Sequence, residues 1–114
     1  NDSPNALIDV YDVAADGSLS NRRRFAEDIG DGSMEVGIPD GMKCDERGNI
    51  WVTGPQGIWI FDASGERLGT LLIPEHVGNL HWGGPDWKTL FVAASTSLYA
   101  IRTLVGPHRE TFMP

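Results

Sequence analysis

Residues 38–52, IPDGMKCDERGNIWV, predict two short strands joined by a polar turn. The turn contains Gly48 and Asn49, residue types that favour tight reversals of the backbone. Two more short apolar runs follow, each after another Gly-containing turn. The expected strands are 42–44, 50–53, 58–61 and 68–73. Four short strands linked by tight turns predict an antiparallel meander.

The same pattern returns further along the chain. Leu90-Phe91-Val92 lies 40 residues after Ile50-Trp51-Val52, and residues 98–101 lie 40 residues after residues 58–61. Leu80-His81-Trp82 corresponds to the strand that begins at Met42. An internal period of this size, with four strands per unit, is typical of the blades of a β-propeller.

The beginning of the chain matches only part of such a unit. Residues 7–12 and 22–26 predict two strands that correspond to the last two of a meander, and a loop rich in Gly follows. We therefore interpret the chain as a single partial all-β domain of propeller blades, about two and a half four-stranded antiparallel meanders. The expected parts are 1–37, the outer half of one blade with a connecting loop; 38–74, a complete blade; and 75–114, most of the following blade.

An open stack of blades leaves both of its flanks uncovered, because repeat units cannot bury their faces alone. Trp59 and Trp82 are therefore expected to be only half-packed. Trp51, Trp59 and Phe91 are interpreted as core aromatics. The partners expected from this reasoning are other propeller blades, from chain beyond these residues or from further copies.

The composition excludes several kinds of partner. The net charge is −7 and the pI is about 4.7, which argues against nucleic acid and anionic membranes. No apolar run approaches the roughly 18 residues of a membrane span. Cys44 is the one cysteine, so we expect no internal disulfide and interpret it as a small buried hydrophobe. A soluble protein is expected, cytoplasmic or periplasmic, with the compartment left open.

Pro39-Asp40-Gly41-Met42-Lys43 and Gly48-Asn49-Ile50-Trp51-Val52-Thr53 resemble motifs of the gluconolactonase, senescence marker protein and regucalcin family. The segments 79–92 and 96–102 are similar to that family's last blade, and 12–22 to the hairpin before its metal-binding Asp. The resemblance implies that this chain is the C-terminal part of a six-bladed propeller. It also implies lactone hydrolysis with one divalent metal ion. Calcium is the expected metal, and zinc, manganese or magnesium are the alternatives.

In that family a Glu, an Asn and an Asp hold the metal, and only the Asp has a match here, Asp40. The resemblance implies that Asp40 is metal ligand and general base, acting on a small-molecule lactone. The first strand of each blade lines the channel, so a residue at its start lies at one mouth. From the residues alone, Asp40-Gly41 is also readable as a turn that leads into a strand.

Further lining residues follow from the same topology. Asn79 starts the next inner strand and is a candidate for binding substrate hydroxyls, although a turn-forming Asn is the alternative. Thr53, Ser95 and Asp2 end or follow second strands, which return to the same mouth, so they are candidate substrate-binding residues. The three histidines, His76, His81 and His108, have no partner at metal-ligand spacing.

Two functions remain open from the sequence. One is a metal-dependent hydrolase of sugar-type lactones that needs further blades or other copies. The other is a catalytically inactive propeller fragment that acts as a binding or assembly module.

Overall fold

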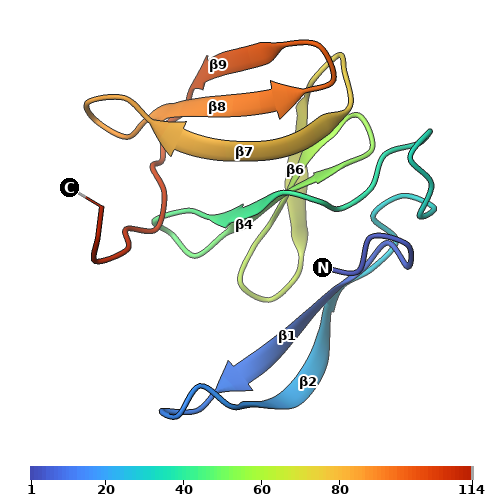
Figure 1. Ribbon diagram of the computed structural model, residues 1–114, viewed down its shortest axis with the longest axis vertical. Coiled ribbons are helices and arrows are strands. Elements are labelled where there is room, and N and C mark those ends of the chain that lie inside the picture. The colour runs from blue at the N-terminus through green and yellow to red at the C-terminus, as the bar shows by residue number, and fades with distance from the viewer. Residues whose placement is uncertain (114) are drawn as a thin grey trace.

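The computed structural model describes residues 1–113, which fold into a thin body with extents of 38 × 37 × 22 Å. Nine β-strands occur in this range (Figure 1). The strands are β1 Ile8–Val13, β2 Leu19–Ala26, β3 Met42–Cys44, β4 Ile50–Gly54, β5 Gly57–Phe61, β6 Arg67–Leu72, β7 Val77–Gly83, β8 Thr89–Ala94 and β9 Leu98–Arg102. The described residues hold no helix that is long and apolar enough to cross a membrane.

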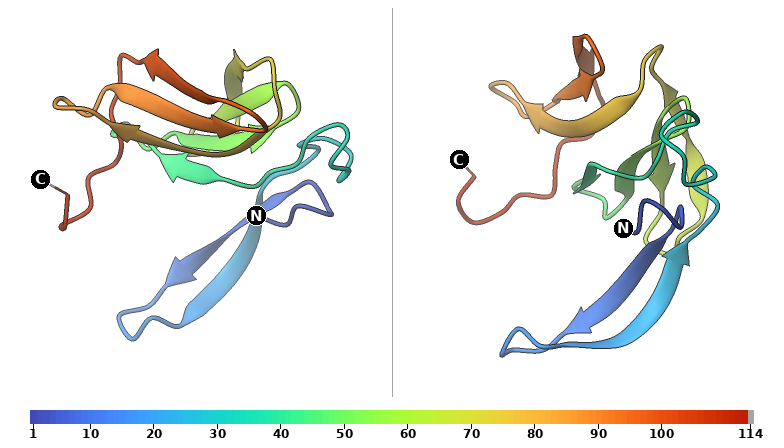
Figure 2. Two further views of the ribbon diagram at one scale, coloured as in Figure 1. Left: turned by 45° about the horizontal axis from the view of Figure 1, so that its top comes forward. Right: turned by 45° about the vertical axis from the view of Figure 1, so that its right-hand side comes forward.

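The strands form three antiparallel sheets with the orders β1-β2, β3-β4-β5-β6 and β7-β8-β9. Sheets that each follow the chain in sequence order are meanders, and the three lie side by side like part of a fan (Figure 2). The predicted all-β fold of propeller blades is therefore confirmed. Each predicted strand is present, with bounds that shift by a few residues at most.

The second and third sheets repeat each other in register. Val52 pairs with Trp59 in the second sheet, and Val92 pairs with Tyr99 in the third, so both partners shift by the same 40 residues seen in the sequence. Because side chains alternate along a strand, an equal register places equivalent residues on equivalent faces. The repeat in the sequence is thus a repeat in three dimensions.

A core cluster joins the second sheet to the third. It combines Trp51 and Ile58 of the second sheet with Leu80, Trp82 and Leu90 of the third, all of them buried. The rings of Trp51 and Trp82 meet edge to face, with centroids 5.0 Å apart and planes at 73°. The expectation of a half-packed Trp82 is therefore wrong: its side chain is 2% exposed, because the neighbouring blade is present to cover it.

A second cluster joins the second sheet to the β1-β2 hairpin. Val52 and Phe61 pack there against Ile8, Ala26 and Ile29. The opposite faces of one sheet thus contact its two neighbours, as stacked blades require.

The other aromatics predicted for the core are less deeply packed. Trp59 is half-buried, as expected for an aromatic residue on a flank of an open stack of blades, and the guanidinium of Arg67 lies 3.4 Å from its ring centroid. Phe91 is 38% exposed, so its assignment to the core is wrong within this chain. It lies on the face of the third sheet that no other described sheet covers.

Asp45 organises the turn between β3 and β4. Its carboxylate is buried and accepts hydrogen bonds from the backbone N–H groups of Arg47 and Asn49, the Asn49 amide and the Trp51 indole, at 2.9 to 3.0 Å. Burial alone raises the pKa of this carboxyl, but the hydrogen bonds from Asn49 and Trp51 bring it below its usual value. The sequence predicted only a turn here.

Cys44 ends β3 and is half-buried rather than fully buried as predicted. Burial, with the charge of Asp45 as a second cause, raises the pKa of its thiol. A thiol with a raised pKa is less reactive, which agrees with a packing role.

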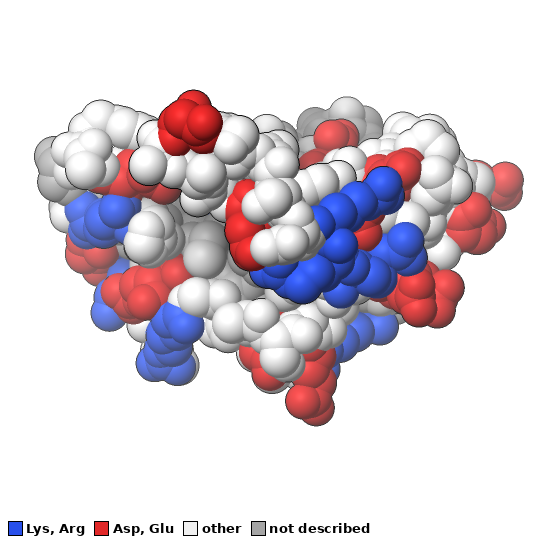
Figure 3. Space-filling model, turned by 90° about the horizontal axis from the view of Figure 1, so that it is seen from below, with Lys and Arg blue, Asp and Glu red and all other residues white. Residues whose placement is uncertain are grey.

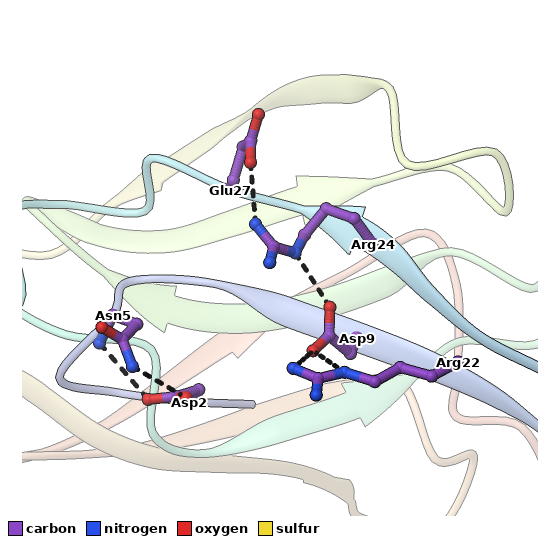
Figure 4. A network of polar contacts seen from close by, with 6 residues as sticks. All are labelled: Asp2, Asn5, Asp9, Arg22, Arg24 and Glu27. Atoms are coloured by element: carbon purple, nitrogen blue, oxygen red, sulfur yellow. Dashed lines mark hydrogen bonds and ion pairs between the residues drawn. The ribbon is translucent and has the colours of Figure 1, made fainter.

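The β1-β2 hairpin carries mixed charge on its exposed face. Figure 3 shows basic side chains gathered directly beside acidic ones on this side of the molecule. Asp9 accepts hydrogen bonds from Arg22 and Arg24, both at 2.8 Å, and Arg24 also bonds Glu27 (Figure 4). Hydrogen bonds from Arg24 and then Arg22 hold the pKa of the Asp9 carboxyl below its usual range. The basic residues are neutralised locally, so they form no uniform positive surface.

Candidate active site at the ends of the inner strands

Asp40 lies directly before the inner strand β3, and its backbone is clamped in place. Its N–H donates to the buried hydroxyl of Thr53 at 2.9 Å, and that hydroxyl donates to the carbonyl of Ile38 at 3.1 Å. The carbonyl of Asp40 accepts a hydrogen bond from the Asn1 amide. The residue as a whole remains exposed. A fixed backbone with an exposed carboxylate is the arrangement that a ligand or base requires.

A hollow of about 430 Å³ adjoins Asp40. Its walls come from the loop before β3, from the start of β7 and from the end of β8. These strand ends lie on one side of the molecule, where β7 begins and β8 finishes (right in Figure 1). Asp40 and His76 are the two titratable residues among the described residues that line it.

Asn79 and Ser95 line the same hollow as Asp40. The side-chain oxygen of Asn79 accepts the N–H of Leu80 at 2.9 Å. The hydroxyl and N–H of Ser95 both donate to the carbonyl of His76, at 3.4 and 3.0 Å. The structure therefore brings Asp40, Asn79 and Ser95 together.

Two of the predicted residues lie elsewhere. Thr53 is fully buried, so its hydroxyl positions the segment before β3 instead of facing the hollow. Asp2 accepts hydrogen bonds from the N–H and amide of Asn5 (Figure 4), and it borders a separate hollow of about 230 Å³ with Asp9 and Tyr11. Sequence position identified the correct strand ends, but it did not say which side chains face the opening.

His76 is the lining residue that sequence reasoning set aside. The inner strands are offset by 38 residues, since Leu80 corresponds to Met42, so His76 corresponds to Ile38, which lines the same hollow. That correspondence was visible in the sequence and offered a way to find it. His81, by contrast, packs its ring against Trp87, with centroids 6.3 Å apart.

The side chains that line this hollow meet only part of the requirements of a metal-binding site. No group of three His, Cys, Asp or Glu side chains that could hold an ion occurs among residues 1–113. An exposed carboxylate at the rim of a hollow does fit as one oxygen ligand of a hard cation. Asp40 is the one carboxylate that the described residues offer to a cation at this hollow.

Gly41 holds the two inner strands together at this site. Its N–H donates to the carbonyl of Gly78 at 3.0 Å, and a Cβ on it would lie 2.5 Å from Asn79 Oδ1 and 2.6 Å from Asn79 Cα. These distances are too short for a side chain, so the close approach of β3 and β7 depends on a glycine.

Replacing Gly41 with Ala should lower the free energy of unfolding by about 2–3 kcal/mol, because the segment of Asp40 and Gly41 must move away from β7, which carries Asn79. Urea unfolding followed by tryptophan fluorescence measures this. Gly69→Ala in β6 is the matched control, since nothing lies within 4 Å of a Cβ at that position. Equal stability of the two variants would contradict the close approach.

Comparison with known proteins agrees with this architecture. The family model for the SMP-30/gluconolactonase/LRE-like region matches residues 1–96. A gluconolactonase of Zymomonas mobilis is 36% identical over 107 residues, which cover 89% of this chain and 29% of the relative. A pentonolactonase of Haloferax volcanii is 39% identical over 93 residues, which cover 75% of this chain and 30% of the relative.

Solved structures give the same result. A protein proposed to be a gluconolactonase superimposes with a TM-score of 0.79 at 28% identity, over 92% of this chain and 34% of that one. The chain therefore spans about a third of the length of the proteins it matches. With the family model matched over most of its residues, the chain belongs to the SMP-30/gluconolactonase/LRE-like family.

Proposed function

We propose that this chain supplies the Asp40 side of the active site of a metal-dependent hydrolase that opens sugar-type lactones. The observation that carries the proposal is the exposed Asp40 at the rim of a hollow, with its N–H and C=O fixed by hydrogen bonds to the side chains of Thr53 and Asn1. Family membership and the relatives named gluconolactonase and pentonolactonase indicate lactone hydrolysis as the reaction class.

Asp40 would act on the attacking water. A carboxylate within hydrogen-bond reach of a water can accept its proton as the oxygen attacks the lactone carbonyl. A bound divalent ion, calcium first and zinc, manganese or magnesium as alternatives, would supply positive charge that polarises this carbonyl, with Asp40 as one of its ligands. Asn79 and Ser95 lie beside Asp40 in the hollow and would hold the hydroxyls of the sugar.

A second candidate function is a binding or assembly module without catalysis of its own. The observation that favours it is the single acidic ligand, because no three-residue metal cluster occurs among residues 1–113. A lone carboxylate holds a divalent ion weakly. On this alternative the chain contributes packing surfaces and not chemistry.

A hybrid enzyme distinguishes between the two candidate functions. The segment of the Zymomonas gluconolactonase that matches this chain is replaced by the matching segment of this chain, and gluconolactone hydrolysis is followed by acid release. We expect activity in the hybrid, its loss after treatment with a chelator, and its return with added calcium, zinc, manganese or magnesium. The chain alone should be inactive under the same conditions.

The original Zymomonas gluconolactonase, assayed in parallel, is the control for removal of the metal by the chelator. A folded hybrid that stays inactive with every metal would contradict the hydrolase and support the assembly module. Activity that survives chelation would contradict the role of the metal.

A further inference from the structure

Opening a lactone requires a proton on each side of the reacting carbon. The attacking water must lose a proton, and Asp40 is the base proposed for that step. The ring oxygen that leaves the same carbon is an alkoxide, which departs readily only when it takes up a proton. A proton donor on the side of the leaving oxygen would therefore speed the reaction.

The residues around the hollow point to His76 as this donor. Among the described residues that line it, Asp40 and His76 are the titratable ones, and no Lys or Arg is present. The amide of Asn79 and the hydroxyl of Ser95 hold their protons too tightly to serve as acids. Histidine is the usual proton donor near neutral pH. Within the described residues the His76 ring makes no hydrogen bond, so its nitrogens can reach a substrate.

The backbone that carries His76 is fixed by the turn between β8 and β9. The carboxylate of Glu75 accepts hydrogen bonds from the hydroxyls of Thr96, at 2.6 Å, and Ser97, at 2.9 Å. The carbonyl of His76 accepts the N–H of Ser95 at 3.0 Å. Two successive residues are thus held to one turn, which gives the ring a defined starting point at the hollow.

The position of His76 relative to Asp40 follows from Gly78. Val77 is buried, whereas His76 and Gly78 on either side of it are exposed, so positions 76 and 78 face the open side together. A Cβ built on Gly78 would lie 4.0 Å from Asp40 Oδ2. Residues two apart in an extended chain are separated by about 7 Å. One small lactone can therefore contact both the carboxylate and the imidazole.

We propose that His76, in its protonated form, donates a proton to the leaving oxygen of the lactone; this role rests on the proposed lactone hydrolysis. Water adds to the carbonyl carbon and gives one proton to Asp40. The bond between this carbon and the ring oxygen then breaks, and the ring oxygen takes a proton from the imidazolium of His76. The product is an open chain with a carboxylic acid and a new hydroxyl. Solvent then removes the proton from Asp40 and returns one to His76.

His76→Gln in the hybrid gluconolactonase tests this role. Gln keeps a polar side chain that can bind a sugar hydroxyl, but it has no acidic proton to donate. We expect kcat for gluconolactone to fall about a hundredfold near neutral pH, with KM little changed. Because His76 is exposed, the variant should fold like the parent hybrid, which circular dichroism checks.

Chemical rescue separates proton donation from a structural role. His76→Ala leaves space at the hollow for a free imidazolium ion, so added imidazole should raise the rate of this variant by about tenfold or more. The N,N′-dimethylimidazolium ion has the same ring and charge but no N–H. It is the matched control reagent and should restore no activity.

Several results would overturn this role. In an active hybrid, a raised KM with unchanged kcat in His76→Gln would make His76 a binding residue and not an acid. Failure of imidazole to rescue His76→Ala, or equal rescue by the dimethylated ion, would exclude proton donation. A parent hybrid without activity is a different failure, because it would contradict the lactone hydrolysis itself and the role of His76 with it.

Discussion

Replacing Asp40 with Asn in the hybrid gluconolactonase is expected to lower kcat by about a thousandfold, within the range for loss of a positioned general base. Asn keeps the size of the side chain and the backbone bonds to Thr53 and Asn1, but it cannot accept a proton from water. It is also a weaker metal ligand than a carboxylate, so the metal concentration needed for half-maximal activity should rise. Initial rates over a metal titration separate these effects.

Asp28→Asn is the matched control for Asp40→Asn. Asp28 is exposed, lies outside the hollow of Asp40 and undergoes the same change of charge. Its positive φ of 58° is one that Asn also accepts, so the backbone should be undisturbed. Full activity in Asp40→Asn, or an equal loss in both variants, would eliminate Asp40 as base and ligand.

Replacing Trp82 with Ala is expected to lower the free energy of unfolding by about 3–5 kcal/mol, the usual cost of removing a buried aromatic side chain. The indole lies between the second and third sheets, packs edge to face on Trp51 and donates from Nε1 to the hydroxyl of Thr103 at 2.9 Å. Ala leaves a cavity at the contact between two blades. Because a domain is stabilised by only about 5–15 kcal/mol, this variant should unfold at a much lower urea concentration.

Phe91→Ala provides the comparison for Trp82→Ala. Phe91 belongs to the same sheet, but its ring lies on the uncovered face, so its loss should cost about 1 kcal/mol in this chain. Urea titration of both variants, followed by circular dichroism, measures the difference. Similar midpoints for the two would mean that the contact between the second and third sheets contributes little to stability.

The number, order and approximate limits of the strands follow from local sequence. Short runs such as Ile58-Trp59-Ile60-Phe61 lie between Gly-containing turns, and both features act over a few residues. The 40-residue repeat added the pairing register of the second and third sheets, because equal turns between equal strands impose equal pairing. The repeat also placed Asp40 just before one inner strand and Asn79 near the start of the next, and the structure finds both beside one hollow.

Which residues are buried, and toward which side their side chains point, depends on contacts between the sheets and did not follow from local sequence. Trp82 and Phe91 are both aromatic residues in predicted strands, yet a neighbouring blade covers the first and not the second. Thr53 and Ser95 both lie at the ends of second strands, but only the fold shows that Thr53 points inward to hold Asp40 and Ser95 borders the opening. The sequence by itself therefore determined the blades and the position of Asp40. Only the tertiary structure decided which surfaces are closed, because burial depends on residues that are distant in the chain.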